Sequence, residues 1–235
     1  MSNCEDILCS DDVEAFRIHL KSITFNRAPF YESVLRKAIK SDAHNCVGCL
    51  LTWGDTFLAD GYNKIINTRA LTHSAVVKRP QYVRMLCEHG ADVHAYHGTD
   101  PVILLYSRVD DDGTNAHGVT IDGVLLKDTA TAISTDTINA IDAKTNYTID
   151  ALRALVEFGA DIDSTSTINR TPLMTAASYN CCELMKVILE LGANIEITDT
   201  DRRTALDVAK RYEHHEAAVI LQSWKGHMTK SANKK

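Results

Sequence analysis

A repeat of 33 residues is the feature of this sequence that most constrains its fold. Four segments end in similar residues around a glycine, and these glycines are 36, 69 and 33 residues apart. The segments are 51–55, 86–92, 156–161 and 189–194. A second marker, Thr171-Pro172-Leu173, recurs 33 residues later as Thr204-Ala205-Leu206. Two independent markers with one period indicate a chain built from repeated units.

The unit that starts at Thr171 predicts its own secondary structure. A Thr hydroxyl can cap a helix N-terminus, and Pro172 suits the first helical position. Apolar residues at helical spacing continue on both sides of Asn180, which predicts two helices joined by a short turn. Gly192 predicts a left-handed C-cap, and turn-forming residues at 199–202 predict a loop. The unit is therefore helix, turn, helix and an extended loop.

This period, the Thr-Pro-Leu start and the Gly-Ala-Asp or Gly-Ala-Asn close resemble the ankyrin repeat. The resemblance covers residues 5–224 and implies an all-α repeat solenoid of helix-turn-helix units with β-hairpin-like finger loops. About six units are expected, including caps. We predict a capping unit at 1–29, an array at 30–224 and a basic flexible tail at 225–235. The units of the array lie near 30–66, 67–98, 99–166, 167–199 and 200–224, the last being a C-terminal cap.

Residues 109–147 interrupt the third unit, between a first helix expected at 101–106 and a second at 149–158. The interruption is either one insertion or two divergent repeats, and a cluster of turn-forming residues at 110–115 favours one insertion. Two short apolar runs flank Asp122-Gly123, which predicts a β-hairpin.

The same segment holds seven Asp and two Lys, so it carries −5 of the net charge of −6. It is either a recognition element or a tolerated surface insertion. Its candidate contact residues are Asp110, Asp111, Asp112, Asp122 and Asp128.

Cysteine and histidine spacings do not predict a metal site. Cys46 and Cys49 form a C-x-x-C, but they align with Leu184 and Val187, which are packing positions of a second helix. The cluster of Cys87, His89, His94 and His97 would point in different directions, because its first two members also align with packing positions. We therefore expect no metal ligands and no cofactor.

Motifs and composition point away from catalysis. No phosphate-binding loop, nucleophile elbow or kinase motif is present, so we expect no catalytic residues. The alternative is an enzyme, or a small-ligand or metal sensor, built around 109–147, where Asp128 or His117 would join helix residues. The net charge of −6 argues against nucleic acid, and no apolar run approaches the ~20 residues that span a membrane. Seven cysteines without a secretory pattern predict reduced thiols and a cytoplasmic or nuclear location.

The resemblance implies a non-catalytic module that binds another protein through a concave surface of finger loops and inner helices. Such a module is an adaptor or inhibitor and is expected to be monomeric alone. The divergence of the repeats favours a pathogen or viral factor acting on a protein in the host cytosol. The expected finger-loop contacts are Asp55, Tyr62, Asn63, Lys64, Tyr96, His97, Thr167, Asn169, Arg170, Asp201 and Arg202. The expected inner-helix contacts are Thr175, Ser178 and Tyr179.

Overall fold

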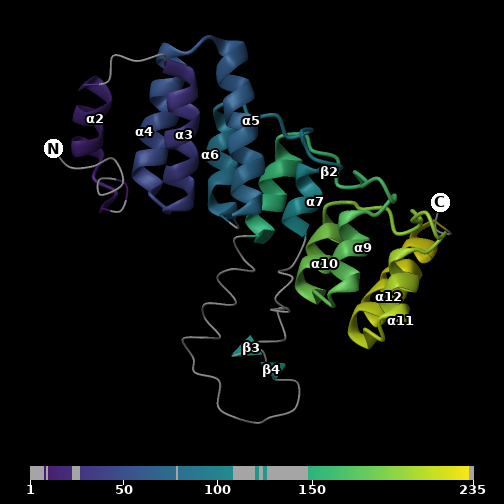
Figure 1. Ribbon diagram of the computed structural model, residues 1–235. Coiled ribbons are helices and arrows are strands. Elements are labelled where there is room, and N and C mark those ends of the chain that lie inside the picture. The colour runs from purple at the N-terminus through teal and green to yellow at the C-terminus, as the bar shows by residue number, and fades with distance from the viewer. Residues whose placement is uncertain are drawn as a thin grey trace. The chain divides into compact units, whose positions relative to one another are not determined.

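A computed structural model describes residues 8, 10–22, 27–77, 79–107, 120–121, 124–125 and 148–232. The chain divides into two compact units, Met1–His97 and Gly98–Lys235. The elements of the first unit are α2 (Val13–Ser22), α3 (Arg27–Lys40), α4 (His44–Phe57), α5 (Asp60–Val76), the 3-10 helix η1 (Pro80–Tyr82), α6 (Val83–Glu88) and β1 (Tyr96–His97). Figure 1 shows them coloured from purple to teal.

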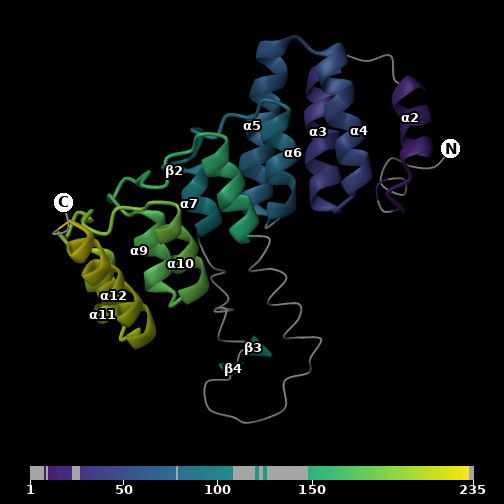
Figure 2. The ribbon, with the colours of Figure 1, turned by 180° about the vertical axis from the view of Figure 1, so that it is seen from behind.

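Helices of the first unit pack in pairs. α3 contacts both α4 and α5, α5 contacts α6, and α2 packs against α4. Views from the front and from behind both show α3, α4 and α5 side by side with nearly parallel axes (Figures 1 and 2). Leu35, Leu50, Leu51 and Leu86 are completely buried between them. Burial of apolar area at these junctions, at about 25 cal/mol per Å², is what stabilises the stack.

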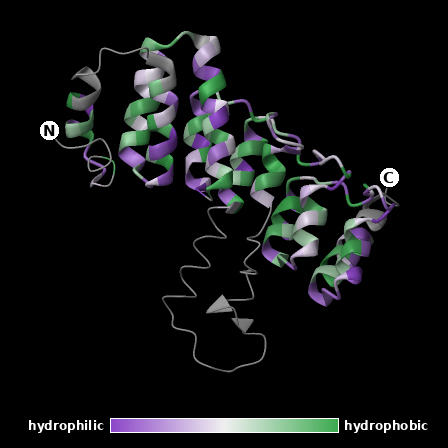
Figure 3. Cartoon of the chain, in the orientation of Figure 1, coloured by the Kyte–Doolittle hydropathy of each residue, from purple (hydrophilic) through white to green (hydrophobic). Residues whose placement is uncertain are grey.

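The second unit repeats this plan. Its elements are β2 (Asp100–Pro101), α7 (Val102–Ser107), a helix at 148–157, α9 (Pro172–Ser178), α10 (Cys182–Glu190), α11 (Ala205–Arg211) and α12 (His215–Ala232). α9 packs against α7, α10 and α11, and α12 packs against α10 and α11. Figure 3 shows hydrophobic and hydrophilic residues interleaved along these helices. Their apolar faces, which include Leu173, Ile188 and Val208, are buried.

The threonine markers act as helix caps, as predicted. The Thr171 hydroxyl accepts a hydrogen bond from the Met174 amide at 3.2 Å, and Pro172 takes the first helical turn. Thr204 forms a reciprocal capping box with Asp207, whose carboxylate accepts the Thr204 amide at 3.0 Å. These hydrogen bonds from Thr204 lower the pKa of Asp207. The second occurrence of the threonine marker is therefore also a helix N-terminus.

The four glycine markers prove to be of two kinds. Gly90, Gly159 and Gly192 have φ of +82°, +95° and +95°, the left-handed conformation that ends a helix and favours glycine. Gly54 lies inside α4, where a Cβ atom would come within 2.5 Å of the Tyr31 hydroxyl. The interpretation of Gly54 as the end of a repeat is therefore wrong: glycine is needed there because another side chain approaches closely.

The predicted unit boundaries need correction in the first unit and at the C-terminus. α3 begins at Arg27, before the expected end of the capping unit, and α5 runs through the expected boundary between 66 and 67. A 17-residue helix therefore replaces the finger loop expected after Gly54. The flexible tail expected from residue 225 is wrong as far as residue 232, because α12 continues to Ala232.

The long interruption is described only in part. The predicted hairpin is present: β3 (Thr120–Ile121) pairs antiparallel with β4 (Val124–Leu125), with Thr120 opposite Leu125. The flanking helices also form, as α7 and the helix at 148–157. The candidate contacts Asp110, Asp111, Asp112, Asp122 and Asp128, together with His117, lie outside the described residues.

Residues with positive φ at the turns before second helices hold neighbouring helix pairs together. Asp11 (φ +48°) accepts hydrogen bonds from the Asn45 and Cys46 amides at 3.0 and 2.9 Å. Asn180 (φ +55°) accepts the Ala217 amide at 3.3 Å. Short polar side chains tolerate this backbone conformation, and here each also caps the second helix of the next pair. We call Asp11 and Asn180 the turn links.

Candidate protein-binding surface

Two loop tips of the second unit, 166–170 and 199–203, lie one 33-residue repeat apart and are built from local hydrogen bonds. In the first tip, the Ser166 amide donates to the Arg170 carbonyl at 3.1 Å, and the Asn169 amide donates to the Ser166 carbonyl at 2.9 Å. Asn169 has φ of +55°, which lets the chain reverse within this tip. We call the two tips together the finger surface.

Asp199 organises the second tip. Its side chain accepts the amides of Asp201 and Arg203, both at 2.9 Å. The Arg203 guanidinium donates to the other carboxylate oxygen at 2.9 and 2.8 Å. Burial alone would raise the pKa of Asp199, but the hydrogen bonds from Arg203 and Asp201 hold it below its ordinary value. Asp199 is therefore a buried anion that fixes the loop around Arg202.

Hydrogen bonds also join the two tips to each other. The Thr200 amide donates to the Ile168 carbonyl at 3.2 Å, and the Asn169 side-chain amide donates to the Thr198 carbonyl at 2.5 Å. The tips therefore form one preorganised surface, and a preorganised surface loses less conformational entropy when it binds.

The finger surface exposes an apolar and a cationic side chain. Ile168 is 52% exposed. Arg202 is exposed with φ of +60° and, among the described residues, forms no ion pair. A non-glycine residue in this conformation costs about 1 kcal/mol or more. This conformation belongs to the turn itself, because the Arg202 amide donates to the Asp199 carbonyl at 2.9 Å and Asn169 has the same conformation at the corresponding position of the first tip.

The structure supports the loop placement of some predicted contacts and corrects others. Thr167, Asn169, Asp201 and Arg202 are exposed on the finger surface, and Arg170 is half-buried there. The Nε atom of Arg170 is buried without a hydrogen-bond acceptor in the described chain.

The expected inner-helix contacts lie on or directly after α9. Thr175 is only 3% exposed and donates to the Thr171 carbonyl at 3.0 Å, so its prediction as a surface contact is wrong. Ser178 and Tyr179 are half-buried at the end of the helix.

In the first unit, only part of the predicted loop set lies in a loop. Tyr96 and His97 are exposed in β1. Asp55 lies in α4, and Tyr62, Asn63 and Lys64 lie in α5, so their placement on a finger loop is wrong.

Asn63 is buried and has a structural role, so it does not form part of a contact surface. It is 6% exposed and donates to Asp55 at 2.6 Å, and Asp55 also pairs with His89. Burial, with the nearby Asp55 charge, raises the pKa of Tyr31 beside this network. Lys64 is exposed and pairs with Asp92 at 3.7 Å.

Sequence reasoning missed Ile168, Thr200 and Asp199. Arg203 follows Asp199 by four positions around a turn, and this spacing was the available signal for a loop held by a carboxylate. Ile168 carried no such signal, because exposure of an apolar residue is set by the tertiary arrangement of its loop.

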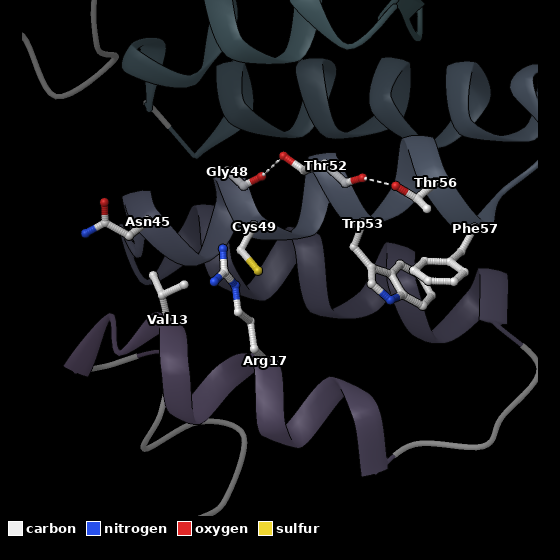
Figure 4. Close-up of a pocket in the computed structure, with 9 residues that line it drawn as sticks. All are labelled: Val13, Arg17, Asn45, Gly48, Cys49, Thr52, Trp53, Thr56 and Phe57. Atoms are coloured by element: carbon white, nitrogen blue, oxygen red, sulfur yellow. Dashed lines mark hydrogen bonds between the residues drawn. The ribbon is translucent and has the colours of Figure 1, made fainter.

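A second candidate site is a groove of about 480 Å³ between α2 and α4 in the first unit. Figure 4 shows its residues: Val13 and Arg17 from α2, and Asn45, Gly48, Cys49, Thr52, Trp53, Thr56 and Phe57 from α4. The Arg17 guanidinium points toward the Cys49 sulfur, and the Trp53 and Phe57 rings lie 5.0 Å apart. Cys49, and secondarily Glu14, raises the pKa of Arg17. The groove offers an apolar wall and one cation.

Cysteine chemistry elsewhere is restricted by burial. Cys46 and Cys87 are buried thiols, as their alignment with packing positions predicted. Burial, aided for Cys46 by Asp11, raises the pKa of each to about 12. Within the described part of the chain, no group of three or more His, Cys, Asp and Glu residues is placed to hold a metal ion.

Comparison with known families agrees with this architecture. The family model for ankyrin repeats (3 copies) matches residues 139–231. The matched segment contains α9 to α12 and the finger surface, so this part of the chain is similar to ankyrin repeats. Among curated proteins, none matches the chain. Ankyrin repeats generally mediate protein–protein interaction and are typically non-catalytic. In the described residues, we find no helix both long and apolar enough to cross a membrane.

Proposed function

We propose that the chain is a non-catalytic adaptor or inhibitor that binds a partner protein through the finger surface. One observation carries the proposal: two hydrogen-bonded tips expose Ile168 on the first tip and Arg202 on the second, and Arg202 forms no ion pair with the described residues. Arginine is one of the residue types that dominate binding energy at protein interfaces, and an exposed isoleucine adds apolar area that a partner can cover.

Three narrower points belong to this proposal. The partner is a cellular protein: the net charge of −6 argues against nucleic acid, and no described helix is long and apolar enough to cross a membrane. The chain acts as a monomer in the cytoplasm or nucleus. Its divergent repeats favour a pathogen or viral factor that engages a host protein.

A photo-crosslinking experiment tests the surface directly. A photoreactive amino acid placed at Ile168 should capture a partner in cells, and the same amino acid at Gln222, which is exposed on α12, should not capture it. The captured protein is then purified, and its affinity for the chain is measured.

Arg202→Gly is the sharpest variant for that affinity measurement. Glycine favours the φ of +60° found at this residue, so the substitution removes the side chain without disturbing the loop backbone. We expect binding to weaken at least about tenfold. Glu213→Gly is the matched control, because Glu213 is also exposed, has φ of +59°, and lies at the other end of α11. Equal affinity of Arg202→Gly and the parent chain would refute the proposal.

A further inference from the structure

A groove of about 410 Å³ lies on the exposed face of α3 and α5 in the first unit. Its lining residues are Glu32, Ser33, Arg36, Lys37 and Lys40 from α3, with His73 from α5. The α3 residues fall at positions 32–33, 36–37 and 40, a spacing of three to four residues that places them on one face of the helix.

An exposed stripe along α5 lies on the same side of that helix as His73, and we call its apolar residues the apolar wall. Tyr62, Ile65 and Val76 are each 50% exposed, and Arg69 lies between them in sequence. Their spacing places all four side chains on one side of the helix. From Tyr62 to Val76 the stripe is about 21 Å long, because an α-helix rises about 1.5 Å per residue. About six residues of extended peptide have this length.

Positive charge dominates the groove. Arg36, Lys40 and Arg69 are cationic, and Glu32 is the single carboxylate among the groove and stripe residues. Arg69 forms an ion pair with the Glu32 carboxylate at 3.1 Å, and Arg36 lies 4.0 Å from the same carboxylate. The cationic side chains therefore exceed the carboxylate that could neutralise them, in a chain whose net charge is −6.

The pKa of His73 is affected by the same positive charges. Burial, followed by the positive charges of Arg36 and Lys40, lowers the pKa of the His73 imidazole. The shift favours the neutral imidazole, so the positive charge of the groove comes from its Arg and Lys side chains.

We propose that this α3–α5 face is a second protein-binding surface, which takes a carboxylate-rich peptide segment of a partner protein that also carries apolar side chains. Carboxylates of the peptide would pair with Arg36 and Lys40, and apolar side chains would cover Tyr62, Ile65 and Val76. Arginine binds carboxylates with two parallel hydrogen bonds, which gives such a pairing orientation as well as affinity.

A peptide fits this face better than a nucleic acid does. Nucleic-acid binding requires a basic stripe that follows many phosphates, and it is opposed here by the net charge of the chain. Half-exposed Ile65 and Val76 would face no complementary group on a phosphate backbone, whereas they match apolar side chains of a peptide.

Fluorescence anisotropy with the full-length chain tests the proposal. The probe is a fluorescein-labelled peptide of about eight residues in which Glu and Leu alternate. We expect saturable binding that weakens as salt is raised, and no binding of a peptide in which Lys replaces Glu. Replacing Leu by Gly should weaken binding as well, because the apolar wall is then left uncovered.

Charge reversal locates the site. Arg36→Glu/Lys40→Glu should weaken binding of the Glu-Leu peptide at least about tenfold. Lys210→Glu/Arg211→Glu is the matched control, since both residues are exposed on α11 in the second unit. Lys40→Glu alone, at a fully surface position, keeps the test valid if the double variant misfolds. Arg202→Gly should leave peptide binding unchanged, which separates this surface from the finger surface.

Three results would overturn the proposal. The first is equal loss of binding in the Lys210→Glu/Arg211→Glu control. The second is tighter binding of a single-stranded oligonucleotide than of the peptide, which would assign the face to phosphates. The third is peptide binding that appears only after Asp110, Asp111 and Asp112 are changed to Asn, which would make the chain's own acidic segment the occupant.

Discussion

Replacing Gly54 with alanine should destabilise the first unit, although alanine is the better helix former. A Cβ atom at this position would lie 2.5 and 2.8 Å from the Tyr31 hydroxyl oxygen and Cζ, and 2.9 Å from the Asn63 side-chain oxygen. Tyr31 is 1% exposed, and Asn63 is held by its hydrogen bond to Asp55. Neither neighbour can move aside without disturbing packed or hydrogen-bonded groups.

The expected magnitude follows from two opposing terms. Alanine gains about 1 kcal/mol over glycine inside a helix. Inserting a methyl group into a packed site costs about 1–3 kcal/mol, and three contacts below 3.0 Å place this site at the upper end. We expect a net loss of about 1–2 kcal/mol in the free energy of unfolding.

Two other glycines provide controls with the opposite sign. A Cβ at Gly48, also in α4, would meet only the Met85 side chain at 3.9 Å, and at Gly61 in α5 it would meet nothing within 4 Å. Both alanine variants should be stabilised by about 0.5–1 kcal/mol. Urea unfolding followed by Trp53 fluorescence measures all three, in a Trp224→Phe background so that one tryptophan reports the first unit. A Gly54→Ala variant as stable as Gly48→Ala would refute the reasoning.

Three further outcomes are expected. Asp199→Asn should lower the free energy of unfolding by about 2 kcal/mol near pH 7, since it removes a buried anion hydrogen-bonded to Arg203. Because folding lowers the pKa of Asp199, this stabilisation is present above the ordinary pKa of 3.8 and is lost as the pH falls through the pKa of the folded state. Urea unfolding between pH 7 and 3 should therefore show the free energies of unfolding of the variant and the parent converging at low pH. Mass spectrometry after iodoacetamide treatment of the folded chain at pH 8 should find half-buried Cys49 modified well before Cys87, whose pKa is about 12. Gly192→Ala should cost about 1 kcal/mol in thermal unfolding, since φ is +95° there.

The second unit could be predicted closely from the sequence because its signals are local. A threonine before proline caps a helix wherever it occurs, and α9 begins as that signal indicates. Gly192 ends its helix in the left-handed conformation for an equally local reason. The caps of α9 and α11 and the two loop tips therefore followed from residue type and spacing, whereas the extension of α12 to Ala232 did not.

The first unit was harder to predict because the same residue types serve other purposes there. Gly54 matches the glycine marker in sequence, but its conformation is set by the approach of Tyr31, which is 23 residues away in the chain. No local pattern shows that α5 extends through 60–76. Its apolar and polar residues are only weakly separated onto two faces, and two of its apolar residues, Tyr62 and Ile65, are exposed. The candidate site had the same limit: Thr175 has the residue type of a surface contact, and only tertiary packing buries it.

The turn links have a consequence for how each unit unfolds. The side chains of Asp11 and Asn180 belong to one helix pair but satisfy amides of the next. In a nearest-neighbour description of a repeat array, their energy is therefore a coupling between pairs and not part of the intrinsic stability of either pair. Loss of one link would leave both flanking pairs intact while reducing their cooperativity. The unfolding transition would then broaden and separate into steps, so these two residues set how far a local opening spreads along the stack.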